Sequence, residues 1–249
     1  MSPLTLSCVI FALSLGGIAA GFLFRMVLPE HHLSKETGDL VRLGAGLTAT
    51  IAALVLGLLT ASAKSTFDTQ SAQVKQMTVD IILLDNLLAQ YGPEARPIRS
   101  QIRAVIGPFV DRIWREKENA GSGPFEIKGD AEKVYLGILA LSPGNGLQRA
   151  LQTRAAQLSN DIVRTRLLLF VESGKLIPRP FLAIMIFWLV ILFATFSLFS
   201  KFNVTGFVFL SIFALSASCA MFLILDLSEP FTGFMSMPSG PLRNALAPL

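Results

Sequence analysis

The chain has 249 residues, of which 52% are hydrophobic and only 15% are charged, and its formal net charge is +4. An average soluble protein carries about 25% charged residues, so this composition argues against an ordinary soluble globular protein. The positive charge does not indicate nucleic-acid binding, because all but five of the 21 Lys and Arg residues lie in one segment, residues 64–179.

Charge-free stretches predict the membrane-spanning parts of the chain. Each is long enough for a helix of about 20 residues, the length that crosses a bilayer. The first is an uncleaved helix rather than a signal peptide, because it has no basic start and its apolar run is longer than usual. The predicted spans are Leu4–Phe24, Leu43–Ala63, Phe181–Phe199 and Val204–Leu225.

The segment between the second and third spans shows helical periodicity and no strand alternation. It contains no P-loop, GxSxG or HExxH motif, and nothing places a nucleophile beside a base. Cys8 and Cys219 lie inside the first and fourth spans, which gives no disulfide framework. We therefore predict an all-α protein with four transmembrane helices and a helical cytoplasmic segment inserted between the second and third. We expect no enzymatic activity, no catalytic residue, no cofactor and no metal site.

The predicted domains follow the spans. Residues 1–63 hold the first two spans, residues 64–179 form a cytoplasmic helical domain, residues 180–227 hold the last two spans, and residues 228–249 are a cytoplasmic C-terminal tail. Basic residues flank the membrane ends of the long segment, and basic flanks stay in the cytoplasm. We therefore expect both termini in the cytoplasm. The flanking residues are Lys64, Lys75, Arg164, Arg166, Lys175 and Arg179.

Small residues recur at a spacing of four along the second span. They let a neighbouring helix approach closely, and they also suit the wall of a narrow conduit when hydroxyl groups lie beside them. Both interpretations stay open. The residues that predict helix packing are Ala45, Ala49, Ala61 and Ser65. The residues that predict a pore wall are Thr50, Ala53, Gly57, Thr60 and Lys64.

Lys64 lies just past the second span, one helical turn before Asp68. In an oligomer, a ring of Lys64 side chains would favour anions at the inner mouth, whereas Asp68 would offset that charge. The alternative is an ordinary interfacial lysine, whose stem covers apolar surface while its ammonium group stays in water.

Two further patterns predict packing inside the chain. Gly17 and Gly21 form a small-xxx-small motif in the first span, which allows close helix approach. No proline occurs between Leu43 and Tyr91, so the second span continues into the soluble segment as one helix. Past the membrane, this helix repeats apolar residues at spacings of four and three, which predicts a seam facing other helices. The seam residues are Met77, Ile81, Leu84, Leu88 and Tyr91.

Several residue runs together resemble the bacterial membrane proteins classed as bestrophin-like domain proteins. The runs are Gly57-Leu-Leu-Thr-Ala-Ser-Ala-Lys64-Ser-Thr-Phe67-Asp68, Leu84-Asp85, Tyr91-Gly92-Pro93-Glu94, Pro180, Phe187-Trp188, Phe199, Asn203, Asp226 to Gly233, and Pro241-Leu242-Arg243. The chain departs from the family pattern at Ser197, where glycine is expected, and at Asn86, where a basic residue is expected.

This resemblance implies a distant similarity to true bestrophins, which are pentameric anion channels with four spans per subunit. It implies a homo-oligomer, with a pentamer as the expected form, in the bacterial inner membrane and with small anions as the conducted species. The calcium clasp of true bestrophins is a dense acidic cluster, whereas here only Asp226 and Glu229 precede Pro230-Phe231. Two side chains are too few for the six to eight oxygens that calcium takes.

The leading hypothesis is thus an oligomeric membrane channel that passes small anions along its second span. The alternative is a membrane-anchored structural or interaction protein, whose cytoplasmic helical bundle binds a partner and whose second span serves assembly only.

Overall fold

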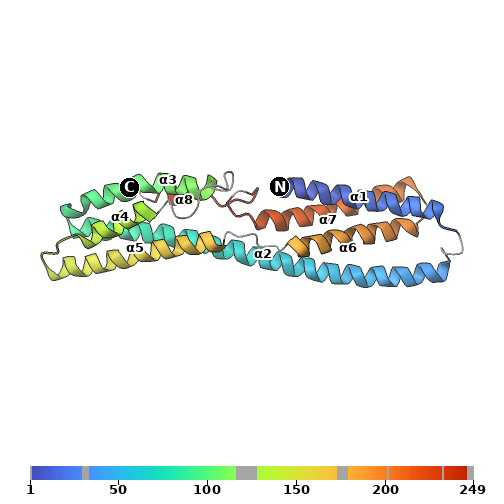
Figure 1. Ribbon diagram of the computed structural model, residues 1–249, viewed down its shortest axis with the longest axis horizontal. Coiled ribbons are helices and arrows are strands. Elements are labelled where there is room, and N and C mark those ends of the chain that lie inside the picture. The colour runs from blue at the N-terminus through green and yellow to red at the C-terminus, as the bar shows by residue number, and fades with distance from the viewer. Residues whose placement is uncertain are drawn as a thin grey trace. The chain divides into compact units, whose positions relative to one another are not determined.

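The computed structural model describes residues 2–29, 34–115, 128–172, 179–200, 202–231 and 233–245. Within these residues every regular element is a helix, which confirms the all-α class there (Figure 1). In chain order the elements are α1 (Pro3–Val27), α2 (Lys35–Tyr91), the 3-10 turn η2 (Pro93–Ala95), α3 (Arg96–Arg115), α4 (Lys128–Leu139), α5 (Gly146–Glu172), α6 (Arg179–Leu198), α7 (Val204–Leu227) and α8 (Gly240–Arg243).

Four of these helices are long and apolar enough to cross a membrane, which confirms the four predicted apolar segments. They are α1, α2, residues Pro180–Leu198 of α6, and α7. The second helix is unbroken through Tyr91, as its lack of proline predicts, and begins earlier than expected, at Lys35. It ends where Gly92 adopts a φ of 132°, a conformation that side-chain-bearing residues rarely take.

The chain forms two compact units. Unit 1 consists of residues Met1–Thr66 and Lys175–Ser228, and unit 2 consists of residues Phe67–Gly174 and Glu229–Leu249. The first half of α2 belongs to unit 1 and its second half to unit 2. These units are defined by contacts within the chain, so the predicted domain boundaries relative to the membrane stay predictions.

Close packing of α1 against α6 depends on the two glycines of the small-xxx-small motif. A Cβ atom at Gly17 would lie 2.8 Å from the carbonyl oxygen of Val190. At Gly21 it would lie 2.0 Å from the Oγ of Ser197 and 2.2 Å from the carbonyl oxygen of Ala194. All three distances are below the 3.0 Å that real Cβ contacts essentially never fall under, and those at Gly21 are far below it, so a side chain at either position would force the helices apart. The predicted packing role of this motif is confirmed.

Ser197, which stands where the family pattern has glycine, lies at this contact between α1 and α6. Ser197 is fully buried, and its hydroxyl donates to the carbonyl oxygens of Phe193 and Ala194 at 3.0 Å each. The side chain thus finds its polar partners on its own helix. The missing Cβ of Gly21 leaves the room that the extra Oγ of Ser197 occupies.

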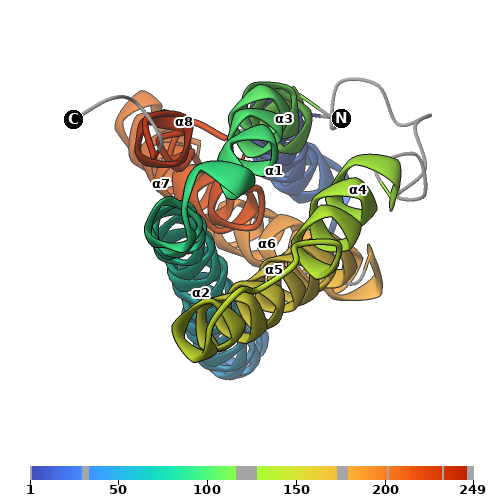
Figure 2. The ribbon, with the colours of Figure 1, turned by 90° about the vertical axis from the view of Figure 1, so that its left-hand side faces the viewer.

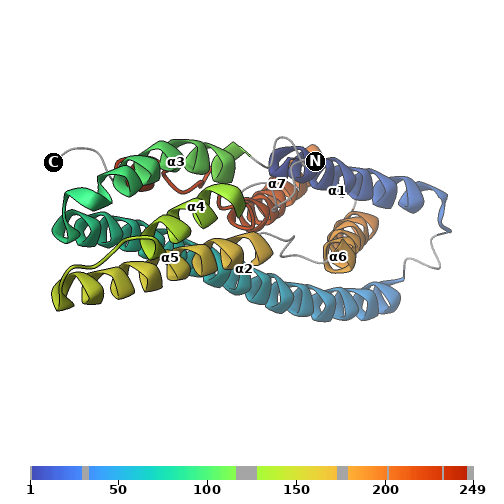
Figure 3. The ribbon, with the colours of Figure 1, turned by 60° about the vertical axis from the view of Figure 1, so that its left-hand side comes forward.

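Unit 2 has a core built from four helices. The seam residues of α2 are at most 4% exposed, which confirms the predicted inward face of that helix. They pack with buried residues of α3, α4 and α5, among them Ile98, Val134 and Leu158. Figures 2 and 3 show α4 beside both α3 and α5. In α5, Leu151 and Ala155 are buried, whereas Leu147 near the start of the helix is 69% exposed.

The described residues from Glu229 onward belong to unit 2, and several of them pack against the end of α3. The indole Nε1 of Trp114 donates to the carbonyl oxygen of Met237 at 2.9 Å. Its ring meets that of Phe231 edge to face, with centroids 5.4 Å apart. Arg243 pairs with Asp111, and Leu242 is fully buried. The predicted tail is therefore an integral part of this helical unit.

Candidate functional site

The membrane-spanning part of α2 is the least covered of the four apolar helices. Only 11% of its most apolar window is buried within the chain, against 33% for α1 and 22% for α6 and α7. Few residues of the span contact the rest of unit 1. Ala63 belongs to its core, and Val55, Leu56 and Leu59 are partly buried against that core. Most of this span therefore faces surroundings other than its own chain.

The five predicted pore-wall residues share one exposed face of α2. A helix turns by about 100° per residue, which places these residues within roughly 80° of one another around the axis. Their common direction lies about 100° away from that of Ala63, which faces the core. We call Thr50, Ala53, Gly57, Thr60 and Lys64 the small-residue face, and all five are exposed.

A second exposed face of the span is made of large aliphatic residues. Leu47, Leu54 and Leu58 are 65–75% exposed, and the same helical turn places them on the side of α2 away from both the core and the centre of the small-residue face. Large aliphatic side chains are what lipid tails contact in a membrane helix. The span thus separates a lipid-type surface from a narrow surface of small and hydroxyl-bearing groups.

No neighbour in the described part of the chain accounts for a glycine at position 57. A Cβ atom added at Gly57 would meet nothing within 4 Å. The same holds at Gly46, which lies on the same face about three turns towards the N-terminus. Packing inside the subunit therefore does not require these glycines. Their effect is to leave the backbone of α2 open to a neighbouring copy, a lipid or a path for ions.

The threonine hydroxyls of this face bond back to their own helix. Thr50 donates to the carbonyl oxygen of Gly46 at 2.9 Å, and Thr60 donates to that of Leu56 at 2.8 Å. A hydroxyl has one proton, so in this arrangement it presents lone pairs rather than a donor to anything outside. The threonines therefore make the face weakly polar without presenting hydroxyl donors to it.

The four residues predicted for helix packing do not lie on one face. A spacing of four exceeds the helical repeat of 3.6, so each step turns by about 40° and the row winds around the helix. Ala45 accordingly is 8% exposed and Ala49 is half-buried, whereas Ala61 and Ser65 are exposed. The first two face their own subunit, and the role of the last two in packing against another copy stays a prediction.

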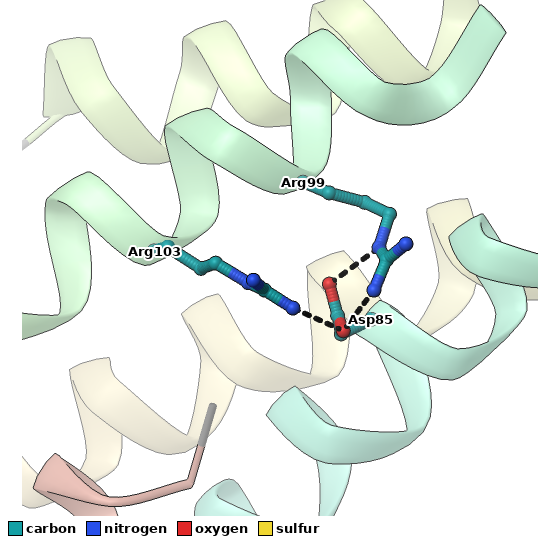
Figure 4. Close-up of polar contacts among 3 residues, drawn as sticks. All are labelled: Asp85, Arg99 and Arg103. Carbon is teal, nitrogen blue, oxygen red and sulfur yellow. Dashed lines mark hydrogen bonds and ion pairs between the residues drawn. The ribbon is translucent and has the colours of Figure 1, made fainter. Parts of the chain in front are cut away.

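Unit 2 holds a charged cluster that the sequence patterns did not single out as a site. The carboxylate of Asp85 on α2 accepts two hydrogen bonds from Arg99 on α3, both 2.8 Å long (Figure 4). Arg103, one turn further along α3, donates to the same carboxylate at 3.4 Å (Figure 4). The Asp85 side chain is 9% exposed, so its carboxylate is largely shielded from water, whereas the side chains of Arg99 and Arg103 are 28% and 48% exposed.

Hydrogen bonds from Arg99 are the largest influence on Asp85 and hold the pKa of this carboxyl below its ordinary value. Burial acts in the opposite direction, and the charges of Arg99 and Arg103 add to the lowering. The cluster fastens α3 to α2 near the turn at Gly92. Asp85 and Arg99 are 14 residues apart across that turn, so the spacing of residues along one helix does not reveal the pair. The sequence pattern that points to the cluster is the four-residue spacing of Arg99 and Arg103, which places both on one side of α3.

The described residues contain no group of three or more His, Cys, Asp and Glu side chains that could hold a metal ion. Asp226 is 3% exposed at the end of α7 in unit 1, and Glu229 belongs to unit 2. Neither residue belongs to a group of three or more possible metal ligands among the residues that the structure describes.

The sequence profile of the Bestrophin-like domain matches residues 10–242, nearly the whole chain. No curated protein and no solved structure matches the chain.

Proposed function

Because the chain belongs to the bestrophin-like domain family of membrane proteins, we propose that it is a homo-oligomeric channel passing small anions. The observation that carries this proposal is the small-residue face of α2, which is exposed on the subunit and separate from its leucine-rich face. When several copies turn this face to a common axis, the second span surrounds a path of small side chains. A pentamer is the expected form, since the family resembles pentameric channels.

Lys64 supplies the selectivity in this proposal. It is exposed at the end of the span, where one ammonium group from each subunit would surround the cytoplasmic mouth. At roughly 8 Å in water, one unit charge changes the energy of a passing ion by about 0.5 kcal/mol. Replacing lysine by glutamate reverses the sign, which amounts to about 1 kcal/mol per subunit before screening by salt.

Planar-bilayer recordings of the purified oligomer test this function. We expect anion-selective currents, and in Lys64→Glu a several-fold shift of the permeability ratio towards cations at low salt. Arg149→Glu is the matched control, because it makes the same charge change at an exposed position of α5 in unit 2. Intact oligomers that stay silent across voltages and salts would contradict the channel. Equal ratios in both variants would remove Lys64 from the mechanism.

The same proposal places the protein in the bacterial inner membrane with both termini and unit 2 in the cytoplasm. Fusions of alkaline phosphatase and of a cytoplasmic reporter to the C-terminus test this orientation. The phosphatase fusion should be inactive and the cytoplasmic reporter active. The reverse pattern would place Lys64 at the outer mouth.

The alternative function, a membrane-anchored interaction protein, is supported by a different observation. On the part of α2 in unit 2, Val79, Ile82 and Leu83 are 37–48% exposed. A contiguous apolar strip on a helix is typical of a protein interface. An electron-microscopy map of the assembled protein separates the two functions, because an occluded or lipid-filled axis excludes conduction through α2 and favours scaffolding.

A further inference from the structure

The last two turns of α5 carry three large apolar side chains on their outer side. Leu167, Leu168 and Val171 are 54%, 41% and 74% exposed. Val171 follows the two leucines at spacings of four and three, so the three side chains form one continuous surface. Leu169, on roughly the opposite side of the helix, is 4% exposed and belongs to the core of unit 2. The core therefore takes one side of α5 and leaves these three residues exposed.

The same side of α5 is polar nearer the start of the helix. Its large exposed residues there are Arg149, Thr153, Gln157 and Asn160. The helical turn of about 100° per residue places them in line with the three apolar residues. Arg164 is exposed on this side too, one turn before Leu167 and Leu168. We call Arg164, Leu167, Leu168 and Val171 the exit face of α5.

The end of α5 lies close, along the chain, to a helix that can span a membrane. Six residues separate Glu172, the last residue of α5, from Arg179, the first residue of α6. The apolar span of α6 begins at Pro180. An extended chain covers at most about 25 Å between two residues with this separation. The exit face is therefore tethered within reach of the surface of any bilayer that α6 crosses.

We propose that the exit face of α5 binds the surface of an anionic phospholipid bilayer. Its three apolar side chains enter the boundary between headgroups and acyl chains, where amphipathic helices bury their apolar side by about 5–10 Å. Arg164 keeps its stem on this apolar surface and its charge at the lipid phosphates. Residues 164–180 contain four basic residues and one acidic residue. This balance favours an anionic surface.

A bilayer fits the exit face better than a protein partner does. Each side of a stable protein interface contributes roughly 20–30 residues, whereas the apolar part of this face has three. A bilayer needs no such area, because α6 already holds the helix near the membrane and makes the association intramolecular. The contact requires that the protein lies in a membrane and does not depend on conduction through α2.

Spin labels on the full-length protein in lipid nanodiscs test the contact. After Cys8→Ala and Cys219→Ala, a label is attached through Leu168→Cys or through Asn160→Cys. Oxygen gathers in the bilayer and a nickel chelate stays in water, so the ratio of their collision rates with the label reports its depth. With phosphatidylglycerol in the nanodisc, the label at position 168 should favour oxygen and the label at position 160 the nickel chelate. A water-like ratio at both positions would overturn the proposal.

Matched variants connect this depth to the apolar residues. With the label attached through Val171→Cys, Leu167→Gln combined with Leu168→Gln should shift the ratio to that of a label in water. Leu147→Gln, at a 69% exposed position near the start of α5, should leave the ratio unchanged. The replaced leucines are exposed, so all variants should melt like the parent protein. An unchanged ratio in the double variant would exclude the exit face as the lipid contact.

A second pair of variants tests the role of lipid charge. Arg164→Gln should lower the ratio of bilayer-bound to water-exposed label about fivefold in nanodiscs with phosphatidylglycerol, since a basic residue near an anionic surface contributes about this factor. Arg149→Gln, exposed on the same side near the start of α5, should have no effect. An equal loss in both variants, or the same depth in nanodiscs of phosphatidylcholine alone, would overturn the preference for anionic lipid.

A second copy of the chain is the competing occupant of the exit face. Labels at position 168 would then collide slowly with both reagents, because protein would cover them. They would also lie near one another in the assembly, so dilution with unlabelled chains would sharpen their spectra. These two results together would replace the lipid contact by a contact between copies, whereas frequent collisions with oxygen support the bilayer.

Discussion

The glycines Gly17 and Gly21 of α1 lie at a contact between two helices of the chain, whereas Gly46 and Gly57 of α2 lie on an exposed face. At Gly17 and Gly21 of α1, an added Cβ would strike backbone oxygens of α6 at 2.8 Å and 2.2 Å. At Gly46 and Gly57 of α2, it would meet nothing within 4 Å. Both pairs look alike in an apolar helix. The difference teaches that packing within the chain requires Gly17 and Gly21 of α1, whereas nothing in the described part of the chain requires Gly46 and Gly57 of α2.

The largest effect on folding is expected from a substitution at the contact between α1 and α6. Gly21→Ala forces the carbonyl of Ala194 and the hydroxyl of Ser197 apart from α1, and overpacking of this kind costs about 1–3 kcal/mol or more. We expect a clear loss of thermal stability in detergent and poor recovery of oligomers. Gly16→Ala is the control on the same helix, since its Cβ meets nothing within 4 Å. Equal melting temperatures for the two variants would refute the close contact.

The next effect concerns the charged cluster that holds unit 2 together. Asp85→Asn leaves two arginines without their carboxylate, and because both are partly exposed we expect a loss of about 1–3 kcal/mol. Asp161→Asn, at an exposed site on α5, should cost little. Chemical unfolding of both variants at neutral pH measures the difference, and a similar loss in each would show that the cluster adds no stability.

The same carboxyl predicts a pH dependence of the unfolding free energy. Its pKa is lower in the folded state, so its contribution is fully present above the unfolded pKa of about 3.9 and is lost as pH falls through the folded value. The stability difference between the parent protein and Asp85→Asn should therefore be constant near neutrality and shrink below about pH 4. A difference that grows on acidification would reverse the sign of the shift.

On the small-residue face of α2, Gly57→Leu should leave the fold of the chain intact and change the conductance or the oligomeric state of the assembly. The site is open, and leucine is a good helix former, whereas glycine is about 0.8–1.0 kcal/mol less favourable in a helix than alanine. We expect unchanged or higher thermal stability together with a strongly reduced conductance or an altered oligomer. Gly44→Leu is the matched control, equally open but about 140° around the helix. Normal currents in Gly57→Leu would separate this face from the conduction path.

The smallest effect is expected at Thr60. Its hydroxyl donates to the carbonyl of Leu56, so Thr60→Val removes only a bond within the helix and keeps the shape of the side chain. We expect a stability change within about 0.5 kcal/mol and an anion/cation permeability ratio like that of the parent protein. A clear loss of anion selectivity in recordings would show that the hydroxyl turns towards the ions and acts as a donor.

Local patterns predicted much of this arrangement and missed what joins distant parts of the chain. The unbroken helix through Tyr91 follows from its lack of proline, and the buried seam of Met77 to Leu88 follows from the spacing of apolar residues along that helix. The Asp85 cluster does not, because its partners lie on two helices across a turn. The five predicted pore-wall residues share one exposed face of α2, whereas the row of small residues around them winds away from it, and their role in a pore stays a prediction.

Composition and charge-free length determined that this is an all-α membrane protein with four apolar helices, since crossing lipid requires about 20 apolar residues in a helix wherever they pack. Periodicity determined which side of a helix carries small residues, but not what they face. Only the tertiary structure decided that Gly21 receives Ser197 and that Gly57 receives nothing from its own chain. The physical reason is that the atoms that approach a glycine come from a segment distant in the sequence, as Ala194 and Ser197 do at Gly21, so the local sequence cannot show whether they are there.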